Sequence, residues 1–211
     1  SATGTIVIAS NQSSNKIVIS RDSGATWPTT PAALTGTANI GTNPKSISMS
    51  GDGNKFAFQS NEGTYTASYS GSVWTLSAYK NVVSSSGSLY TKVVSISRDG
   101  SRIVTASSSD KIHFTSDFGT TWETATAHSA SRTIACVSIS GDGSRIGLCD
   151  SNGPSYYATF NNGVLSTWTS SVVPSNGFWT SLTSSFTGTY WVGTMENSSR
   201  SSHGIQVSAD S

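Results

Sequence analysis

The amino-acid sequence predicts an all-β protein built from a repeated unit of four short strands. Three observations lead to this prediction. Ser and Thr supply 72 of the 211 residues while charged residues make up only 11%, tryptophans recur at a regular spacing, and short segments alternate apolar with hydroxylated side chains. A disordered chain would carry a higher net charge than +1 or fewer apolar residues than 35%, and a coiled coil would be rich in Glu, Lys and Leu.

The balance of charge excludes further classes of protein. With 12 basic and 11 acidic side chains, the chain has no electrostatic footprint for nucleic acid or for an anionic membrane. No apolar run approaches the roughly 20 residues that cross a bilayer. Two sequons, Asn11-Gln12-Ser13 and Asn197-Ser198-Ser199, are compatible with secretion. We therefore expect one extracellular or surface-associated domain over residues 1–211, with no nucleic-acid or membrane partner.

Tryptophans spaced by 46 to 48 residues divide the chain into similar phrases, which end at Trp27, Trp74, Trp122 and Trp168. Residues 20–27 and 115–122 share the pattern Ser/Thr-x-Asp-x-Gly-x-Thr-Trp, and residues 67–74 and 159–168 are decayed copies of it. A period of about 47 residues is typical of propeller blades. We expect five units, at about residues 1–35, 36–80, 81–128, 129–173 and 174–211.

A second phrase runs out of phase with the first. Ser alternates with Ile or Val and an Asp-Gly pair follows at residues 46–53, 94–100 and 137–143, and a faded copy at 181–188 has Thr187 in place of the Asp. The alternation is the period-2 signal of a strand, and Asp-Gly is typical of a hairpin turn. Each unit is therefore predicted to contain strand A, an Asp-Gly turn, strand B, a polar turn, strand C, the Trp phrase and strand D.

The units at both termini are incomplete in this prediction. The chain begins with strands B, C and D, continues through three complete units and finishes with A, B and C, which gives 18 strands. The simplest closed arrangement is a five-bladed β-propeller with two incomplete blades. The alternative is an excerpt of a longer propeller or repeat array. Because unpaired strand edges invite pairing with another chain, self-association through the terminal blades is expected to be possible.

The two intact Trp phrases resemble the Asp-box, or BNR, repeat of sialidase-like β-propellers, sortilin-type receptors and photosystem assembly factors. In that family the box is a structural hairpin between the outer two strands of a blade. The resemblance implies that the box Asp accepts hydrogen bonds from turn amides and that the box Trp packs into the blade. The structural residues that it implies here are Asp22, Gly24, Trp27, Asp117, Gly119 and Trp122.

The two cysteines are predicted to face each other. In the hairpin centred on residues 141–144, Cys136 lies directly opposite Cys149, within reach of a disulfide. A pair of buried thiols is the alternative. Since neither a Cys-x-x-Cys spacing nor a neighbouring His accompanies them, a metal site is not expected, and no motif calls for a cofactor.

The acidic residues argue against catalysis. Most of the eight Asp fall in predicted turns or boxes, whereas a glycosidase needs two carboxylates about the scissile bond. Sialidases of the resembling family hold their substrate with three Arg, but Arg102 and Arg145 occupy the same repeat position as Lys55. We therefore expect a protein that is not an enzyme, with a sialidase-like glycoside hydrolase as an alternative.

Aromatic, amide and carboxylate side chains gather on one predicted face of the propeller, where the B–C turns and the D–A connections lie. Such groups favour carbohydrate recognition, and packing between blades is the alternative. We expect a non-catalytic binding module, either lectin-like or protein-binding. The other hypothesis is a structural unit of a fibre, sheath or virion surface. The candidate ligand-binding residues are Asn61, Tyr79, Tyr90, Asp110, His128, Asn152, Tyr156 and Trp179.

Overall fold

The computed structural model describes residues 1–11, 16–27, 34–35, 44–80, 93–106, 111–126, 133–151, 153–161, 163–170, 177–197 and 203–209. These residues form 19 strands and no helix, which confirms the all-β prediction for the part of the chain that the structure describes. Over the same residues there is accordingly no apolar helix of the length needed to cross a bilayer.

The strands form five sheets that follow one another along the chain. The first contains β1 (Val7–Asn11) and β2 (Lys16–Ser20), and the second β4 (Ser46–Met49), β5 (Lys55–Gln59), β6 (Thr64–Ser70) and β7 (Val73–Lys80), with β3 (Leu34–Thr35) beside β7. The third contains β8 (Val93–Ile96), β9 (Ile103–Ala106), β10 (Lys111–Thr115) and β11 (Glu123–Thr126). The fourth contains β12 (Ile134–Ile139), β13 (Arg145–Asp150), β14 (Ser155–Asn161), β15 (Val164–Leu165) and β16 (Thr169–Ser170), and the fifth β17 (Gly177–Ser184), β18 (Tyr190–Asn197) and β19 (His203–Ala209).

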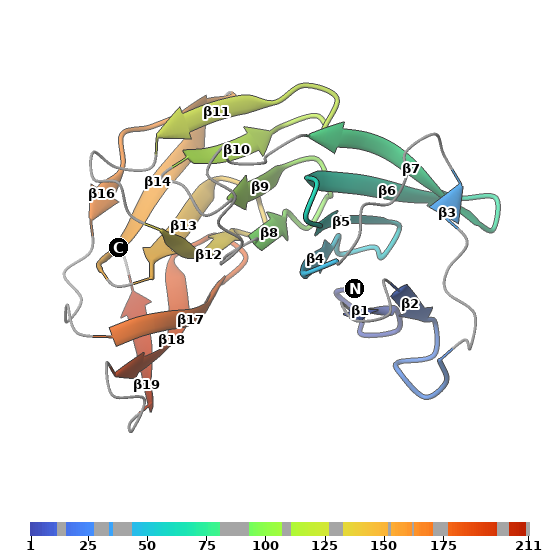
Figure 1. The fold of residues 1–211 in the computed structure, drawn as a ribbon, viewed down its shortest axis with the longest axis horizontal. Helices are drawn as coiled ribbons and strands as arrows, with labels where there is room; N and C mark the ends of the chain where they lie inside the picture. Colours follow the sequence, from blue (N-terminus) through green and yellow to red (C-terminus); the bar gives the residue numbers. More distant parts are fainter. Residues whose placement is uncertain are drawn as a thin grey trace.

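The sheets are arranged along an open arc (Figure 1). The sheet of β1 and β2 lies at one end and the sheet of β17, β18 and β19 at the other. The first strands of the second to fifth sheets, β4, β8, β12 and β17, lie on the inner side of the arc, and each contacts the next one. The described residues show no closed ring.

Among the described residues, the first sheet has fewer strands than the sequence predicts. It contains two described strands, and β3, which follows the first box, pairs in parallel with β7 of the second sheet, with Leu34 opposite Trp74. The long strand β7 would otherwise present an open edge, and such an edge recruits a further strand. In the fourth sheet the predicted outer strand is divided into β15 and β16, which pair with different parts of β14.

Apolar cores lie between the sheets. In β5, Phe56 and Phe58 face the first sheet and pack with Ile17, whereas Ala57, on the opposite side of the strand, packs with Ile103 of the third sheet. This alternation follows from the pleat of a strand. The second, third and fourth sheets each have a neighbouring sheet on both faces. Buried apolar side chains therefore occur on both faces of their strands.

Serine hydroxyls connect the inner strands of neighbouring sheets. The inner strands approach closely because Ser is small, and its hydroxyl then accepts a hydrogen bond from the backbone of the next strand. This gives a structural reason for the repeated alternation of Ser with apolar residues. The bonds run from the Val94 N–H to Ser46, from the Ile96 N–H to Ser48 and from the Ile139 N–H to Ser95, at 3.1, 3.2 and 3.1 Å.

Replacing Ser95 with Ala is expected to lower the free energy of unfolding by about 1–3 kcal/mol, because the buried N–H of Ile139 loses its acceptor. Urea denaturation measures the change. The matched control is Ser70→Ala, at the exposed end of β6, where the change is expected to stay within about 0.5 kcal/mol. Equal stabilities of the two variants would contradict the role given to Ser95.

Candidate functional site

Five turns of the same construction lie between the first two strands of the repeat, at residues 1–6, 50–55, 97–102, 140–145 and 185–190; we call them the A–B turns. Each begins with Ser and has Gly at its fourth position, with φ between 70° and 77°. In the second turn, the Ser50 hydroxyl accepts a hydrogen bond from the Lys55 N–H at 3.0 Å, and the Gly53 N–H donates to the Ser50 carbonyl at 3.1 Å. Positive φ is the reason for glycine at this position.

Three of the A–B turns carry an Asp that accepts hydrogen bonds from its own turn. The Ser97 hydroxyl donates to Asp99 at 2.6 Å and the Ser101 N–H donates at 3.0 Å, and Asp52 and Asp142 have the equivalent partners. Burial raises the pKa of these carboxyl groups, but the hydrogen bonds outweigh it and hold each pKa below its ordinary value. The three side chains are therefore ionised acceptors at neutral pH.

The A–B turns are joined to one another through their backbones. The second residue of one turn donates to the second residue of the next, and in the fourth link the third residue is the donor. The bonds run from Ala2 to Gly51, from Gly51 to Arg98, from Arg98 to Gly141 and from Asp142 to Phe186, at 2.8, 2.7, 2.8 and 2.8 Å.

Glycine at the second position permits this approach. A Cβ at Gly51 would lie 2.4 Å from Cγ of Arg98, and one at Gly141 would lie 2.5 Å from Cδ2 of Phe186. Such distances are far inside van der Waals contact, so a larger residue would push the turns apart. A turn therefore has glycine at its second position where the next turn carries a large side chain at that position.

An open cavity of about 530 Å³ lies where the A–B turns meet. All five sheets contribute to it through these turns. The Arg98 side chain is exposed, its Cζ lies 5.6 Å from the centre of the Phe186 ring, and Phe186 is 54% exposed. The lining residues are Ala2, Thr3, Gly51, Asp52, Arg98, Asp99, Gly141, Asp142 and Phe186.

The basic residues at the sixth position of the turns lie between sheets rather than in this cavity. Arg102 donates to the carbonyl of Gly143 at 2.8 Å, and its Cζ lies 5.0 Å from the centre of the Phe160 ring. Arg145 donates to the carbonyl of Gly188 at 3.4 Å. Each arginine thus bridges its own pair of sheets.

The two Asp boxes are closed by their carboxylates. Asp117 accepts hydrogen bonds from the Thr121 N–H at 2.9 Å and from the Thr115 hydroxyl at 2.7 Å, and Asp22 accepts from Thr26 and Ser20. Hydrogen bonds from Thr26 lower the pKa of Asp22 to about 2. Burial raises the pKa of Asp117, but the bonds from Thr121 and Thr115 outweigh it and lower the pKa to about 2.

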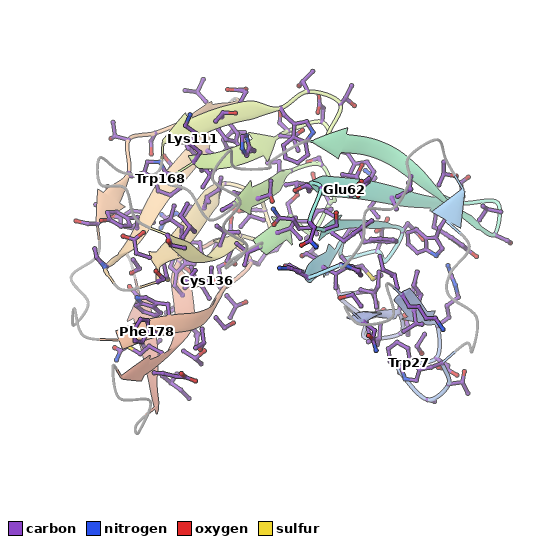
Figure 2. All side chains as sticks on the ribbon, in the orientation of Figure 1. Trp27, Glu62, Lys111, Cys136, Trp168 and Phe178 are labelled. Carbon is purple, nitrogen blue, oxygen red and sulfur yellow. The ribbon has the colours of Figure 1, made fainter. Side chains whose placement is uncertain are left out.

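The tryptophans of the two boxes differ. Trp122 is partly buried against the cluster of the second and third sheets, and its indole N–H donates to the carbonyl of Gly119 at 2.9 Å. Trp27 is 41% exposed and lies at the end of the arc (Figure 2). The expectation of packing into the blade is wrong for Trp27, because it lies beyond the two described strands of the first sheet, which stands at one end of the series.

Half of the predicted ligand-binding residues fall outside what the structure describes. Asn61 lies half-buried in the turn between β5 and β6. The backbone of Tyr79 lies in β7 opposite Tyr65, but its side chain is not described. The residues outside the described part are Tyr90, Asp110, His128 and Asn152.

Two further candidates lie between the fourth and fifth sheets instead of on a binding face. Tyr156 lines a cavity of about 40 Å³, which has room for water but not for a sugar ring. Trp179 is 6% exposed, and its indole N–H donates to the carbonyl of Gly153 at 3.0 Å. The prediction of Trp179 as a ligand contact is therefore wrong, and its ring serves packing.

The cysteines pair in register but do not form the predicted disulfide. Cys136 lies opposite Cys149, yet both are buried free thiols that pack with Trp179 of the fifth sheet; Cys136 is labelled in Figure 2. The register shifts between Ile134 and Cys136, and both side chains fill the space against the indole. Burial raises the pKa of the Cys149 thiol, which keeps it protonated and unreactive.

The residues that line the cavity were not predicted, because the Asp-Gly pairs of the A–B turns indicate hairpin turns and carry no sign of a ligand. A signal was present at the second position of the turns. Arg98 and Phe186 stand there, where the other turns have Ala or Gly. Among the described residues, no group of three or more His, Cys, Asp and Glu could hold a metal ion.

Acid is expected to destabilise the protein partly through Asp117. A carboxyl group with a lowered pKa in the folded state stabilises the fold above its unfolded pKa of about 4, and this contribution is lost as the pH falls to about 2. Thermal unfolding between pH 6 and pH 2 measures it. Asp117→Asn should melt below the wild type at pH 6 and approach it at pH 2; a constant difference over this range would contradict the assignment.

Both thiols are expected to react only after unfolding. Ellman's reagent should detect two thiols per chain in denaturant without reductant and none in the native protein, because both side chains are buried. Prior treatment with a reductant should leave both counts unchanged. Fewer than two thiols in denaturant would show that the disulfide forms.

Comparison with known proteins gives likeness in fold alone. No protein-family model matches the chain, and no curated protein matches it. Among solved structures, a chain of Kuenenia stuttgartiensis hydrazine synthase is similar, with a TM-score of 0.68 and 15% sequence identity. The similarity covers 93% of this chain and 54% of that one, so this chain spans about half the length of the similar protein. At such identity the likeness supports an all-β architecture.

Proposed function

We propose that the chain is a non-catalytic binding module that holds a carbohydrate ligand in the cavity between its A–B turns. The observation that carries this proposal is the cavity of about 530 Å³, which has an exposed aromatic ring and an exposed guanidinium at its wall. Phe186 offers an apolar face to a sugar ring, and Arg98 offers donors to its hydroxyl oxygens. An aromatic surface with a few aimed polar groups is the usual composition of such a site.

The carboxylates of the cavity suit binding better than catalysis. Asp52, Asp99 and Asp142 each have a pKa below the ordinary value. A glycosidase needs one carboxylic acid that stays protonated until it donates to the leaving group, and its pKa is therefore raised. Ionised carboxylates fixed in their turns accept hydrogen bonds from ligand hydroxyls but cannot serve as that acid.

We also propose an architecture and a location for the protein. Five sheets in series, repeated A–B turns and two boxes that resemble the Asp-box phrase support a β-propeller of five blades of about 47 residues. The two sequons support an extracellular location. The alternative function, a structural unit of a larger assembly, has separate support in the exposed apolar side chains of the fifth sheet.

Glycan-array binding followed by titration of a retained oligosaccharide tests the site. Arg98→Ala is expected to weaken binding by about 10- to 100-fold, since hydrogen bonds from a charged group contribute about 1.5–3 kcal/mol. Phe186→Ala should weaken it as well, because the sugar loses its apolar contact. The matched control is Trp27→Ala, which removes an exposed aromatic ring outside the cavity and should leave affinity unchanged.

Two results would contradict this proposal. The first is a wild-type protein that retains no glycan across a broad array. The second is binding that survives Arg98→Ala and Phe186→Ala but is lost in Asn61→Ala, which would place the ligand at the turn between β5 and β6.

A further inference from the structure

Among the described residues, the fifth sheet is covered on one face only. On its inner face, Trp191 lies against Gly147 of the fourth sheet, where a Cβ would come within 2.5 Å of the indole. The opposite face carries Tyr190 and Val192 of β18 and Ile205 and Val207 of β19. Their exposed fractions are 57%, 37%, 72% and 68%. Val192 lies opposite Val207, so these side chains form one continuous apolar surface, which marks an interaction site.

Successive sheets are locked together by one contact that repeats four times. The sixth residue of each A–B turn lies over the glycine at the fourth position of the next turn. A Cβ at that glycine would meet the overlying side chain at 2.6 to 2.9 Å. The pairs are Ile6 over Gly53, Lys55 over Gly100, Arg102 over Gly143 and Arg145 over Gly188.

The chain also contains one unmatched half of this contact at each end. Tyr190 is the sixth residue of the last turn, where its N–H donates to Ser185 as in the other turns, and its side chain is exposed. Gly4 is the fourth residue of the first turn and has a φ of +73° like the others, yet no described residue comes within 4 Å of a Cβ built on it. A side chain and its matching glycine thus have no partner among the described residues and belong to the sheets at the two ends of the arc, which Figure 1 shows.

We propose that the fifth sheet of one copy packs on the first sheet of a second copy, with Tyr190 over Gly4. The outer face of the first sheet is suited to this contact. Ile8 and Ile19 point to the second sheet, so the alternating positions Val7, Ala9 and Val18 face outward. The contact continues the inter-sheet interface that the chain already forms four times.

The backbone series extends in the same way. Phe186 accepts from Asp142 and stands last in the series of linked turns, while Ala2 donates to Gly51 and stands first. In the pair of copies, the Phe186 turn donates to the Ala2 carbonyl of the second copy. Because the two surfaces differ, the interface is heterologous, and it generates either a ring or an open filament. This inference is independent of the proposed ligand.

Two blocked variants test the proposal by sedimentation velocity over a range of concentrations. Val207→Lys places a charge on the outer face of the fifth sheet, and Gly4→Phe fills the open position on the first turn. Wild type should associate, and each variant alone should be monomeric. An equimolar mixture should form dimers and nothing larger, because each variant keeps one intact surface. Ile205→Lys provides a second way to block the fifth sheet.

The control for Gly4→Phe is Gly71→Phe. Gly71 also has a positive φ, +56°, and open space at its Cβ, so the variant carries similar backbone strain in the turn between β6 and β7, which belongs to neither surface of the proposed contact. It should associate as the wild type does. Thermal unfolding of every variant shows whether it is folded.

Several results would overturn the proposal. A wild type that is monomeric at every concentration would overturn it. If both blocked variants also have a lower melting temperature than the wild type, the first and fifth sheets of one chain pack on each other instead. Association that survives Gly4→Phe but not Val207→Lys would indicate edge-to-edge pairing of β19. If the mixture of the two blocked variants stays monomeric, association does not use two different surfaces.

Discussion

The hydrogen bonds between successive A–B turns are the constraint on which the rest of the arc depends. They bring the backbones of neighbouring sheets together at the inner side, where only glycine fits at Gly51 and Gly141. Serine hydroxyls extend the same close approach along the inner strands. Farther out the sheets diverge, and large side chains such as Phe56 and Trp74, whose rings lie 4.7 Å apart, fill the wider space.

The same turns also form the cavity, so the scaffold and the proposed site are one structure. Their backbones hold the arc together, and their second and third residues face the opening. Arg98 shows both roles, because its backbone donates to Gly141 and accepts from Gly51 while its side chain lines the cavity. Ligand contacts can therefore vary at these positions. Where one turn has a large side chain at its second position, the preceding turn needs glycine at the same position.

Much of the fold was predictable because its signals are local. The Ser alternation and the Asp-Gly pairs located the inner strands and A–B turns, and the register count placed Cys136 opposite Cys149. Predictions that depend on contacts between residues far apart in the sequence were less accurate. The pairing of β3 with β7, the exposure of Trp27 and the packing of the thiols on Trp179 are decided by the position of a sheet in the series. The cavity was missed for the same reason, since it exists only where turns from five sheets converge.

Native-state amide hydrogen exchange measured by NMR tests the turn-to-turn bonds most directly. The amides of Gly51, Arg98 and Asp142 lie in turns at the protein surface but donate to the neighbouring turn. They should exchange as slowly as amides of the inner strands, since both open only when sheets separate. Exchange as fast as that of an exposed turn amide such as Ser72 would contradict the account.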